Sequence, residues 1–173
     1  MVVLDTCILL LFLEPRTNPP LDQQTGAPLE RAAERIDNLV KTLSQQAEPI
    51  IIPTPVLSEA LVYAGRATNS WIEKINKSSA FRLEAFEQRA AIEAADAIAQ
   101  ARKRNKSKKD SDASWTKVKF DRQIVAIAKS RGASVIYSDD KDIEKFAKGT
   151  GIQVIKTREL PLPPESAQPS LPF

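Results

Sequence analysis

Histidine is absent from this chain of 173 residues, and cysteine occurs once, as Cys7. A single cysteine cannot form an internal disulfide bond. The lack of histidine also excludes zinc sites built from imidazole and thiolate ligands, Ser-His-Asp triads and histidine general bases. If the protein is an enzyme, other side chains must supply its chemistry.

Long apolar runs and glycine-rich loops are missing as well. The apolar stretch 8–13 is far too short to span a bilayer, and no positively charged segment precedes it as in a signal peptide. We therefore expect a cytoplasmic protein without a membrane partner. The five glycines form no phosphate-binding loop and stand where turns or helix caps are expected.

The order of apolar segments predicts an α/β fold. A length of 173 residues, with 42% hydrophobic and 27% charged residues, fits one globular domain. Short apolar runs predict strands at 1–4, 50–53, 133–137 and 152–156, and helices are expected over 8–13, 29–46, 54–65, 81–104 and 121–131. This alternation predicts a three-layer α/β/α sandwich with a small parallel sheet. We assign residues 1–159 to this domain and the proline-rich residues 160–173 to a C-terminal tail.

Acidic residues directly follow two of the predicted strands. Asp5 follows the first strand, while Asp139 and Asp140, with Asp142 close behind, follow the strand at 133–137. Ligands of open parallel sheets bind at the carboxyl ends of the strands, so these acids are candidates for a site. Each also has a structural explanation, because Asp5 can cap a helix and 139–142 can form a solvated turn.

Two further acids lie in predicted helices. Glu59 lies in an apolar helical turn, where we expect partial burial, and Asp121 begins the helix 121–131, where it could be an N-cap. Carboxylates gathered with Asp5 and Asp140 would repel one another unless a divalent cation lay between them. Ligands that are all oxygen favour Mg²⁺ or Mn²⁺ over zinc. Such an ion can activate water for attack on a phosphodiester without a histidine base.

Basic residues crowd before Asp121, although the net charge is only +3. Their density suggests contacts with the phosphates of a nucleic acid, and a solvated connector is the alternative explanation. The candidate contacts are Arg102, Lys103, Arg104, Lys106, Lys108, Lys109, Lys117 and Lys119, with Arg122 just after Asp121.

Three segments together resemble the PIN-domain family, which includes the VapC-like toxin ribonucleases of bacterial toxin-antitoxin pairs. They are VVLDT at 2–6, PTPVLSEAL at 53–61 and KFDRQIVAIAKSRGASVIYSDDKDI at 119–143. The resemblance implies a PIN-like fold and an endoribonuclease that cuts RNA with Mg²⁺ or Mn²⁺. It raises an antitoxin protein as a partner, and a homodimer stays open.

The resemblance also implies a set of site residues. By position, the acidic tetrad of the family corresponds to Asp5, Glu59, Asp121 and Asp140, with Asp139 or Asp142 able to take the last place. Thr6 and Ser138 match the small hydroxyl residues beside the first and last acids.

Two other interpretations compete with the nuclease. A non-catalytic PIN-like module that binds RNA or protein is one, but four matching acids argue against it. A haloacid-dehalogenase-like phosphatase is the other, but Cys7 stands where that enzyme needs a second Asp.

Overall fold

A five-stranded parallel sheet forms the centre of the protein, in the strand order β3-β2-β1-β4-β5. In this computed structural model, residues 1–22, 25–103 and 115–163 are described. The strands are β1 Val2–Leu4, β2 Ile50–Pro53, β3 Phe81–Glu84, β4 Val135–Tyr137 and β5 Gln153–Ile155. Because all of them run in one direction, their carboxyl ends share one edge of the sheet.

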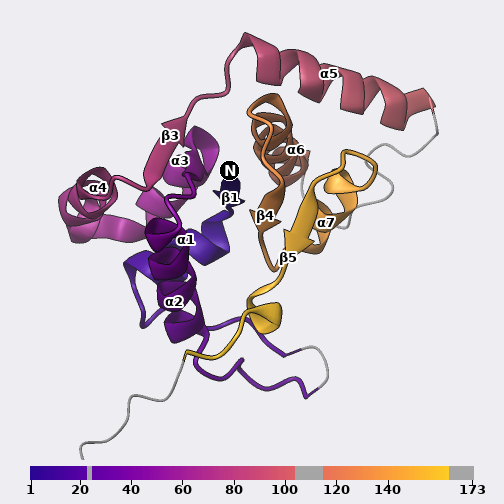
Figure 1. Cartoon of the computed structure of the whole chain (residues 1–173). Helices are drawn as coiled ribbons and strands as arrows, with labels where there is room; N and C mark the ends of the chain where they lie inside the picture. Colours follow the sequence, from indigo (N-terminus) through magenta and orange to yellow (C-terminus); the bar gives the residue numbers. More distant parts are fainter. Residues whose placement is uncertain (23–24, 104–114, 164–173) are drawn as a thin grey trace, which may run out of the picture.

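Helices cover both faces of this sheet (Figure 1). Helices α1 Thr6–Leu13, α2 Ala32–Gln45, α3 Thr54–Ala64 and α4 Thr68–Lys77 lie on one side. On the other side lie α6 Trp115–Ser130 and α7 Lys141–Ala147, and α5 Gln88–Lys103 packs on α6. Right-handed crossovers explain this division, since the chain moves from β1 to β3 in one direction and returns in the other. The predicted three-layer α/β/α sandwich is confirmed.

The central strand β1 is buried along its whole length. Val3 is aligned with Ile51 of β2 on one side and with Ile136 of β4 on the other, and all three are at most 1% exposed. Strands covered on both faces are uniformly apolar, which explains why the runs VVL and III lack polar alternation. This packing fixes the place at which Asp5 leaves the sheet.

Two predicted helix starts are wrong. Residues 81–84 were expected to begin a long helix but form the edge strand β3, aligned with β2, and α5 begins at Gln88. Hydrogen bonding to β2 stabilises the extended conformation of residues 81–84. The alanine-rich sequence that follows them is typical of a helix, so the sequence alone does not indicate this strand. Helix α6 begins at Trp115 instead of Asp121. Asp121 therefore lies inside a helix, and the N-cap explanation for it is wrong.

The end of the described chain packs against the domain. Leu160 is 6% exposed, and its carbonyl oxygen accepts a hydrogen bond from the Arg35 guanidinium of α2. Most of the predicted tail, residues 164–173, lies outside the described residues, so the boundary after residue 159 stays a prediction. Within the part of the chain that is described, no helix has both the length and the apolar character needed to cross a membrane.

Two helices end in the same hydrogen-bond pattern with different residues at its key position. After α6, the N–H groups of Gly132 and Ala133 donate to carbonyls of the last turn, and after α2 those of Ala47 and Glu48 do the same. The pattern requires one residue with a left-handed backbone conformation. This residue is Gly132 after α6, at φ 69°, and Ala47 after α2, at φ 54°. A Cβ atom in this conformation costs roughly 1–2 kcal/mol, which glycine avoids.

We predict opposite effects for two exchanges at these helix ends. Ala47→Gly should raise the free energy of unfolding by about 0.5–1 kcal/mol, because relief of strain exceeds the added flexibility of the unfolded chain. Gly132→Ala should lower it by a similar amount. Denaturant unfolding of both variants beside wild type measures the changes, and a loss of stability in Ala47→Gly would contradict the explanation.

Candidate active site

Asp5 lies at the carboxyl end of the central strand, where it caps helix α1. One carboxylate oxygen accepts a hydrogen bond from the Thr6 backbone N–H at 2.7 Å, and the other accepts one from Ser138 Oγ at 2.7 Å. The residue is only 6% exposed. Burial raises the pKa of Asp5 above its ordinary value, and the charge of Asp140 acts in the same direction. Its capping role and a site role are therefore compatible.

A group of three carboxylates lies beside Asp5. Asp121 of α6, Asp140 at the N-cap of α7 and Asp142 in its first turn each offer an oxygen, and these oxygens lie within 4.8 Å of one another. Burial raises the pKa of Asp121 to about 7, and the charges of Asp140 and Asp5 add to this effect, although Lys117 opposes it. The three helix-borne acids thus form a compact and electrostatically unfavourable cluster.

Lys117 places a positive charge inside this cluster. Its Nζ lies 3.0 Å from Asp121 Oδ2 and also donates a hydrogen bond to Asp140 Oδ2. Lys117 precedes Asp121 by one helical turn, so α6 itself positions the ammonium group. Lys117 is predicted from the sequence as a phosphate contact, and this ion pair is not predicted. A helix start at residue 115 would have indicated it, through the i,i+4 spacing.

Glu59 reaches the same region from α3 but stays outside the three-carboxylate group. Its Oε2 accepts a hydrogen bond from Thr6 Oγ1 at 2.6 Å. The expectation of partial burial is wrong, because Glu59 is exposed. The side chain of Glu59 lines an open cleft. Thr6 and Ser138 thus each donate to one acid, Glu59 and Asp5 respectively.

Asp139 has a different orientation from its neighbour Asp140. Its carboxylate accepts hydrogen bonds from the Thr157 backbone N–H at 2.9 Å and from Thr157 Oγ1 at 2.5 Å. Thr157 begins the short 3₁₀ helix η3 Thr157–Glu159 after β5. Of the three candidates for the last ligand position, Asp140 and Asp142 join the carboxylate group, whereas Asp139 ties the loop to η3.

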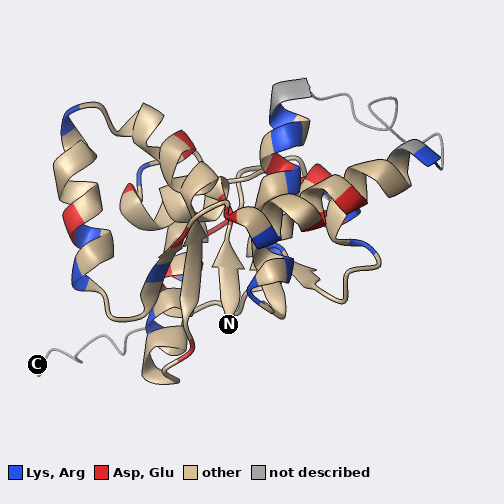
Figure 2. Cartoon of the chain, turned by 90° about the horizontal axis from the view of Figure 1, so that it is seen from above, with Lys and Arg blue, Asp and Glu red and all other residues tan. Residues whose placement is uncertain are grey.

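Five of the six candidate acids, all except Asp142, line one cleft of about 700 Å³ at the carboxyl edge of the sheet. Figure 2, which views the molecule from above, shows red acidic segments meeting near its middle, beyond the tip of β1. Helices α3 and α6 contact each other there, although most of each lies on opposite faces of the sheet. The lining residues are Asp5, Thr6, Cys7, Leu10, Ser58, Glu59, Val62, Tyr63, Lys117, Phe120, Asp121, Asp139 and Asp140.

Cys7 lines the cleft as a thiol that donates toward Asp5 Oδ2 at 3.5 Å. Burial, together with the negative charge of Asp5, raises the pKa of the Cys7 thiol well above its ordinary value. The thiol is therefore protonated at neutral pH, which makes it a poor nucleophile.

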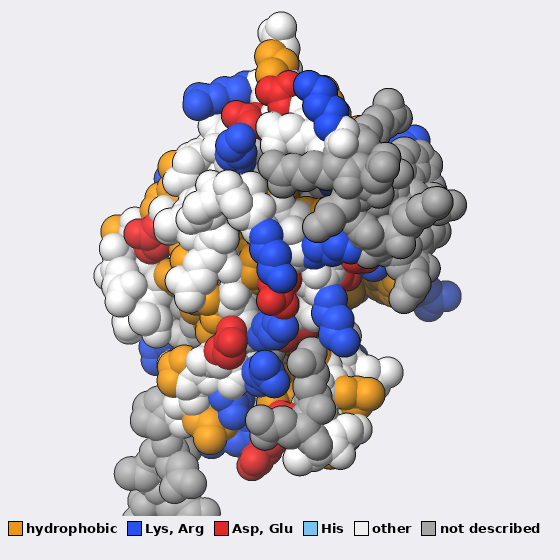
Figure 3. Space-filling view, turned by 90° about the vertical axis from the view of Figure 1, so that its right-hand side faces the viewer, with side chains coloured by type: hydrophobic (Ala, Val, Ile, Leu, Met, Phe, Trp, Pro, Cys, Tyr) orange, Lys and Arg blue, Asp and Glu red, His pale blue; other side chains and the backbone are white. Residues whose placement is uncertain are grey.

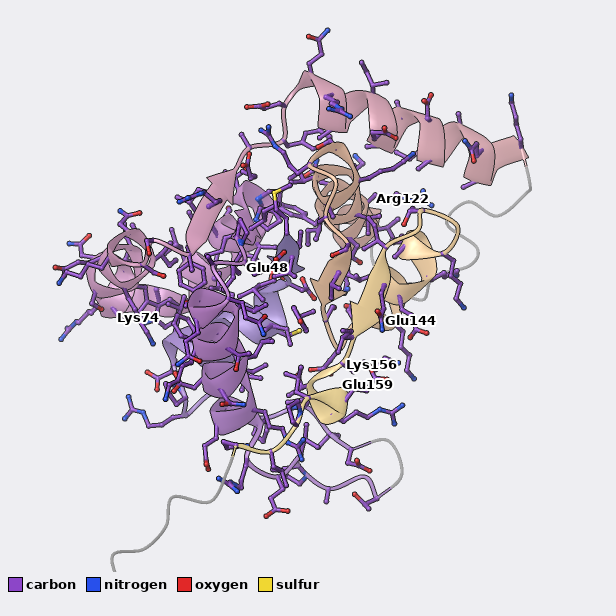
Figure 4. All side chains as sticks on the ribbon, in the orientation of Figure 1. Glu48, Lys74, Arg122, Glu144, Lys156 and Glu159 are labelled. Carbon is purple, nitrogen blue, oxygen red and sulfur yellow. The ribbon has the colours of Figure 1, made fainter. Side chains whose placement is uncertain are left out.

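The predicted basic contacts have several different environments. Arg104, Lys106, Lys108 and Lys109 lie outside the described residues, as does the side chain of Arg102. Arg122 is half-buried and stacks on the Phe146 ring of α7, 4.5 Å from its centroid, in the space between α6 and α7 (Figure 4). Lys103 and Lys119 are exposed. On the face shown in Figure 3, basic side chains alternate with acidic ones. Phosphate binding by these residues stays a prediction.

The donor set fits a hard divalent cation. Carboxylate oxygens close enough to share one ion are the ligands that Mg²⁺ and Mn²⁺ prefer. The cluster already attracts the ammonium group of Lys117. Asp121, Asp140 and Asp142 can therefore hold such an ion, with Asp5 beside them.

Comparison with known proteins agrees with this architecture. A family model described as "PIN domain" matches residues 2–149. DNA-bound VapBC from Salmonella typhimurium is a similar structure, with 16% identity, a TM-score of 0.59, and coverage of 90% of this chain and 97% of that chain. VapBC2 from Rickettsia felis, bound to a promoter DNA fragment, has 12% identity, a TM-score of 0.60 and coverage of 90% and 98%. FitAB bound to a DNA fragment has 17% identity, a TM-score of 0.60 and coverage of 93% and 98%. No curated protein matches the chain.

We predict that Lys117→Met tightens Mn²⁺ binding and weakens the metal-free protein. An entering ion would no longer displace the ammonium group, so the affinity for Mn²⁺ should rise by up to about 5-fold, the range of a partly exposed ion pair. Without metal the acids would lose their counter-charge, and the melting temperature in EDTA should fall. Calorimetric titration with Mn²⁺ measures the first effect. Lys119→Met removes the same charge from the same helix and serves as the control. Equal affinity in both variants would show that Lys117 does not compete with the ion.

The raised pKa of Asp121 predicts a pH dependence with a defined sign. Its pKa in the folded protein, about 7, exceeds the ordinary value of 3.8, so its contribution to stability is complete below about pH 4. This contribution is lost as the pH rises through 7. Without histidine, few other groups titrate between about pH 5 and 7. In EDTA, wild type should therefore lose more stability than Asp121→Asn between these pH values. Urea unfolding at each pH measures the free energy of unfolding. An equal change of this free energy with pH in the two proteins would contradict the prediction.

Proposed function

Because the chain belongs to the PIN-domain family, we propose that it is an endoribonuclease that hydrolyses RNA with Mg²⁺ or Mn²⁺. One observation carries the proposal: Asp121, Asp140 and Asp142 offer oxygens within 4.8 Å of one another, beside the buried Asp5. A non-catalytic module has no need to gather these charges. A structural role alone would favour their replacement by neutral groups, since buried like charges destabilise a fold.

The described residues divide the chemical work in this proposal. Asp121, Asp140 and Asp142 would hold the cation. The orientation of the neighbouring Asp5 is fixed by hydrogen bonds from Ser138 and Thr6. Glu59 faces the cleft from α3 and can orient a water molecule or complete the ligand set. A bound divalent ion would lower the pKa of water and offset the negative charge that develops on the phosphate. Lys117, once released from the acids, is placed to contact a phosphate oxygen.

A toxin role within a toxin-antitoxin pair is the finer part of the proposal. It is supported by similarity over about nine-tenths of the chain to structures of VapBC, which are bound to DNA. An antitoxin protein is then the expected partner, homodimerisation is a further possibility, and the cytoplasm is the expected location because RNA is the substrate.

We predict metal-dependent cleavage of RNA that requires the acids of the cleft. Wild type should cut mixed RNA with Mg²⁺ or Mn²⁺ and stop in EDTA. Asp5→Asn and Asp121→Asn should each lose orders of magnitude in rate, because the ion is misplaced or lost. Asn keeps the size of Asp, and Asp121 is not a helix cap, so the folded structure should persist.

Gel analysis of the RNA products, beside a melting curve for each variant, measures both properties. Asp96→Asn, which removes an exposed charge from α5, is the matched control. Cleavage that continues in EDTA, or at the wild-type rate in both cleft variants, would remove the acids from the mechanism.

A further inference from the structure

Among the aromatic side chains whose exposure the structure describes, the two most exposed both line the acidic cleft. Tyr63 is 67% exposed and Phe120 is 37% exposed, and both line the cleft. Val62, which is 79% exposed, and Leu10 add apolar surface beside them. Exposed apolar side chains that gather in one patch, unlike single scattered ones, mark binding sites. Their position at one cleft therefore points to a ligand.

The two rings come from the two helices that approach each other across the cleft. Tyr63 lies on α3, one helical turn after Glu59, and Phe120 lies on α6, next to Asp121. Each of these two helices, which contact each other, thus contributes one ring and one acid to the lining of the cleft. The cleft therefore combines carboxylates with aromatic side chains.

We propose that Tyr63 and Phe120 stack on an unpaired nucleobase next to the phosphate that is cut. This inference rests on the proposed nuclease function and narrows its substrate to single-stranded or looped RNA. A nucleotide offers the required combination, since its base has a π-face and its phosphate binds a divalent cation and Lys117. In a duplex the bases are stacked inside the helix, and rings on the protein surface cannot reach their faces.

The size and polarity of the cleft agree with this ligand. A volume of about 700 Å³ lies within the range of sites that enclose small ligands, roughly 300–1,000 Å³. An apolar protein segment docked on the rings would cover the carboxylates of the cleft without neutralising them, which is unfavourable. A nucleotide with its cation covers the rings and neutralises the acids together. The observations therefore favour a nucleobase over a protein surface.

The test compares binding of single-stranded and double-stranded RNA. Each substitution is made in the Asp121→Asn protein, so that the RNA stays intact, and fluorescence anisotropy measures the affinity for a short labelled RNA. Tyr63→Leu and Phe120→Leu keep apolar surface but remove the ring. Each should weaken single-strand binding roughly 5- to 100-fold, the range of one stacked base. Tyr63→Phe should bind like its parent, and duplex binding should not change.

Ile92→Ala is the matched control, because it shortens a 56% exposed apolar side chain on α5 that does not line the cleft. Unchanged single-strand affinity in both ring variants would overturn the inference. An equal loss for single and double strands would do the same, since it would show a general packing effect. If wild type were a dimer in gel filtration and the ring variants were monomers, the rings would belong to an interface between copies of the chain, which also overturns it.

Failure of the proposed function has a separate signature. If the wild-type protein cleaves RNA with Mn²⁺ while the ring variants bind single-stranded RNA normally, only the inference about the rings is wrong. If the wild-type protein neither binds nor cleaves RNA, both proposals are wrong. Melting curves of the ring variants should match wild type, because the substituted side chains are exposed.

Discussion

Repulsion among carboxylates at the end of a parallel sheet is the constraint on which the rest of the site depends. The fold places Asp5 after β1 and Asp140 after β4, and α6 brings Asp121 between the same elements. Such a cluster is unfavourable unless a positive charge compensates for it. Lys117 supplies that charge from within the chain. The same position is the one a divalent ion would take, so fold stability and ion binding are coupled through one side chain.

The acids of the cleft differ in how firmly the fold holds them. Asp5 accepts hydrogen bonds on both oxygens, and Asp139 is fixed by Thr157. Glu59 is exposed and has a single hydroxyl partner in Thr6 among the contacts described. The site therefore has a rigid side formed by β1 and β4 and a more open side formed by α3. Under the proposed function, the fixed acids would orient the cation while the open side admits the RNA.

Much of the fold could be predicted from the sequence because most of its strands are short, uninterrupted apolar runs. The strands at 1–4, 50–53, 133–137 and 152–156 are all predicted in this way, and acids directly follow the first and third of them. The edge strand β3 was missed, since its pairing with β2 is a tertiary effect and an alanine-rich helix follows it closely. The exposure of Glu59 was missed for a similar reason, because it depends on which face of α3 other helices cover. The ion pair of Lys117 with Asp140 joins residues far apart in sequence and needed the packing of α6 beside α7.

The hydrogen bonds between Asp139 and Thr157 connect the acidic loop to one of the last elements of the fold. From there the chain continues to Leu160, which is held by Arg35 on the opposite side of the sheet. Both β5 and η3 follow every acid of the cleft in the sequence. A chain that ends before residue 157 has these acids but lacks the contacts that hold the loop of Asp139. The order of the acidic loop thus depends on elements that follow it in the chain.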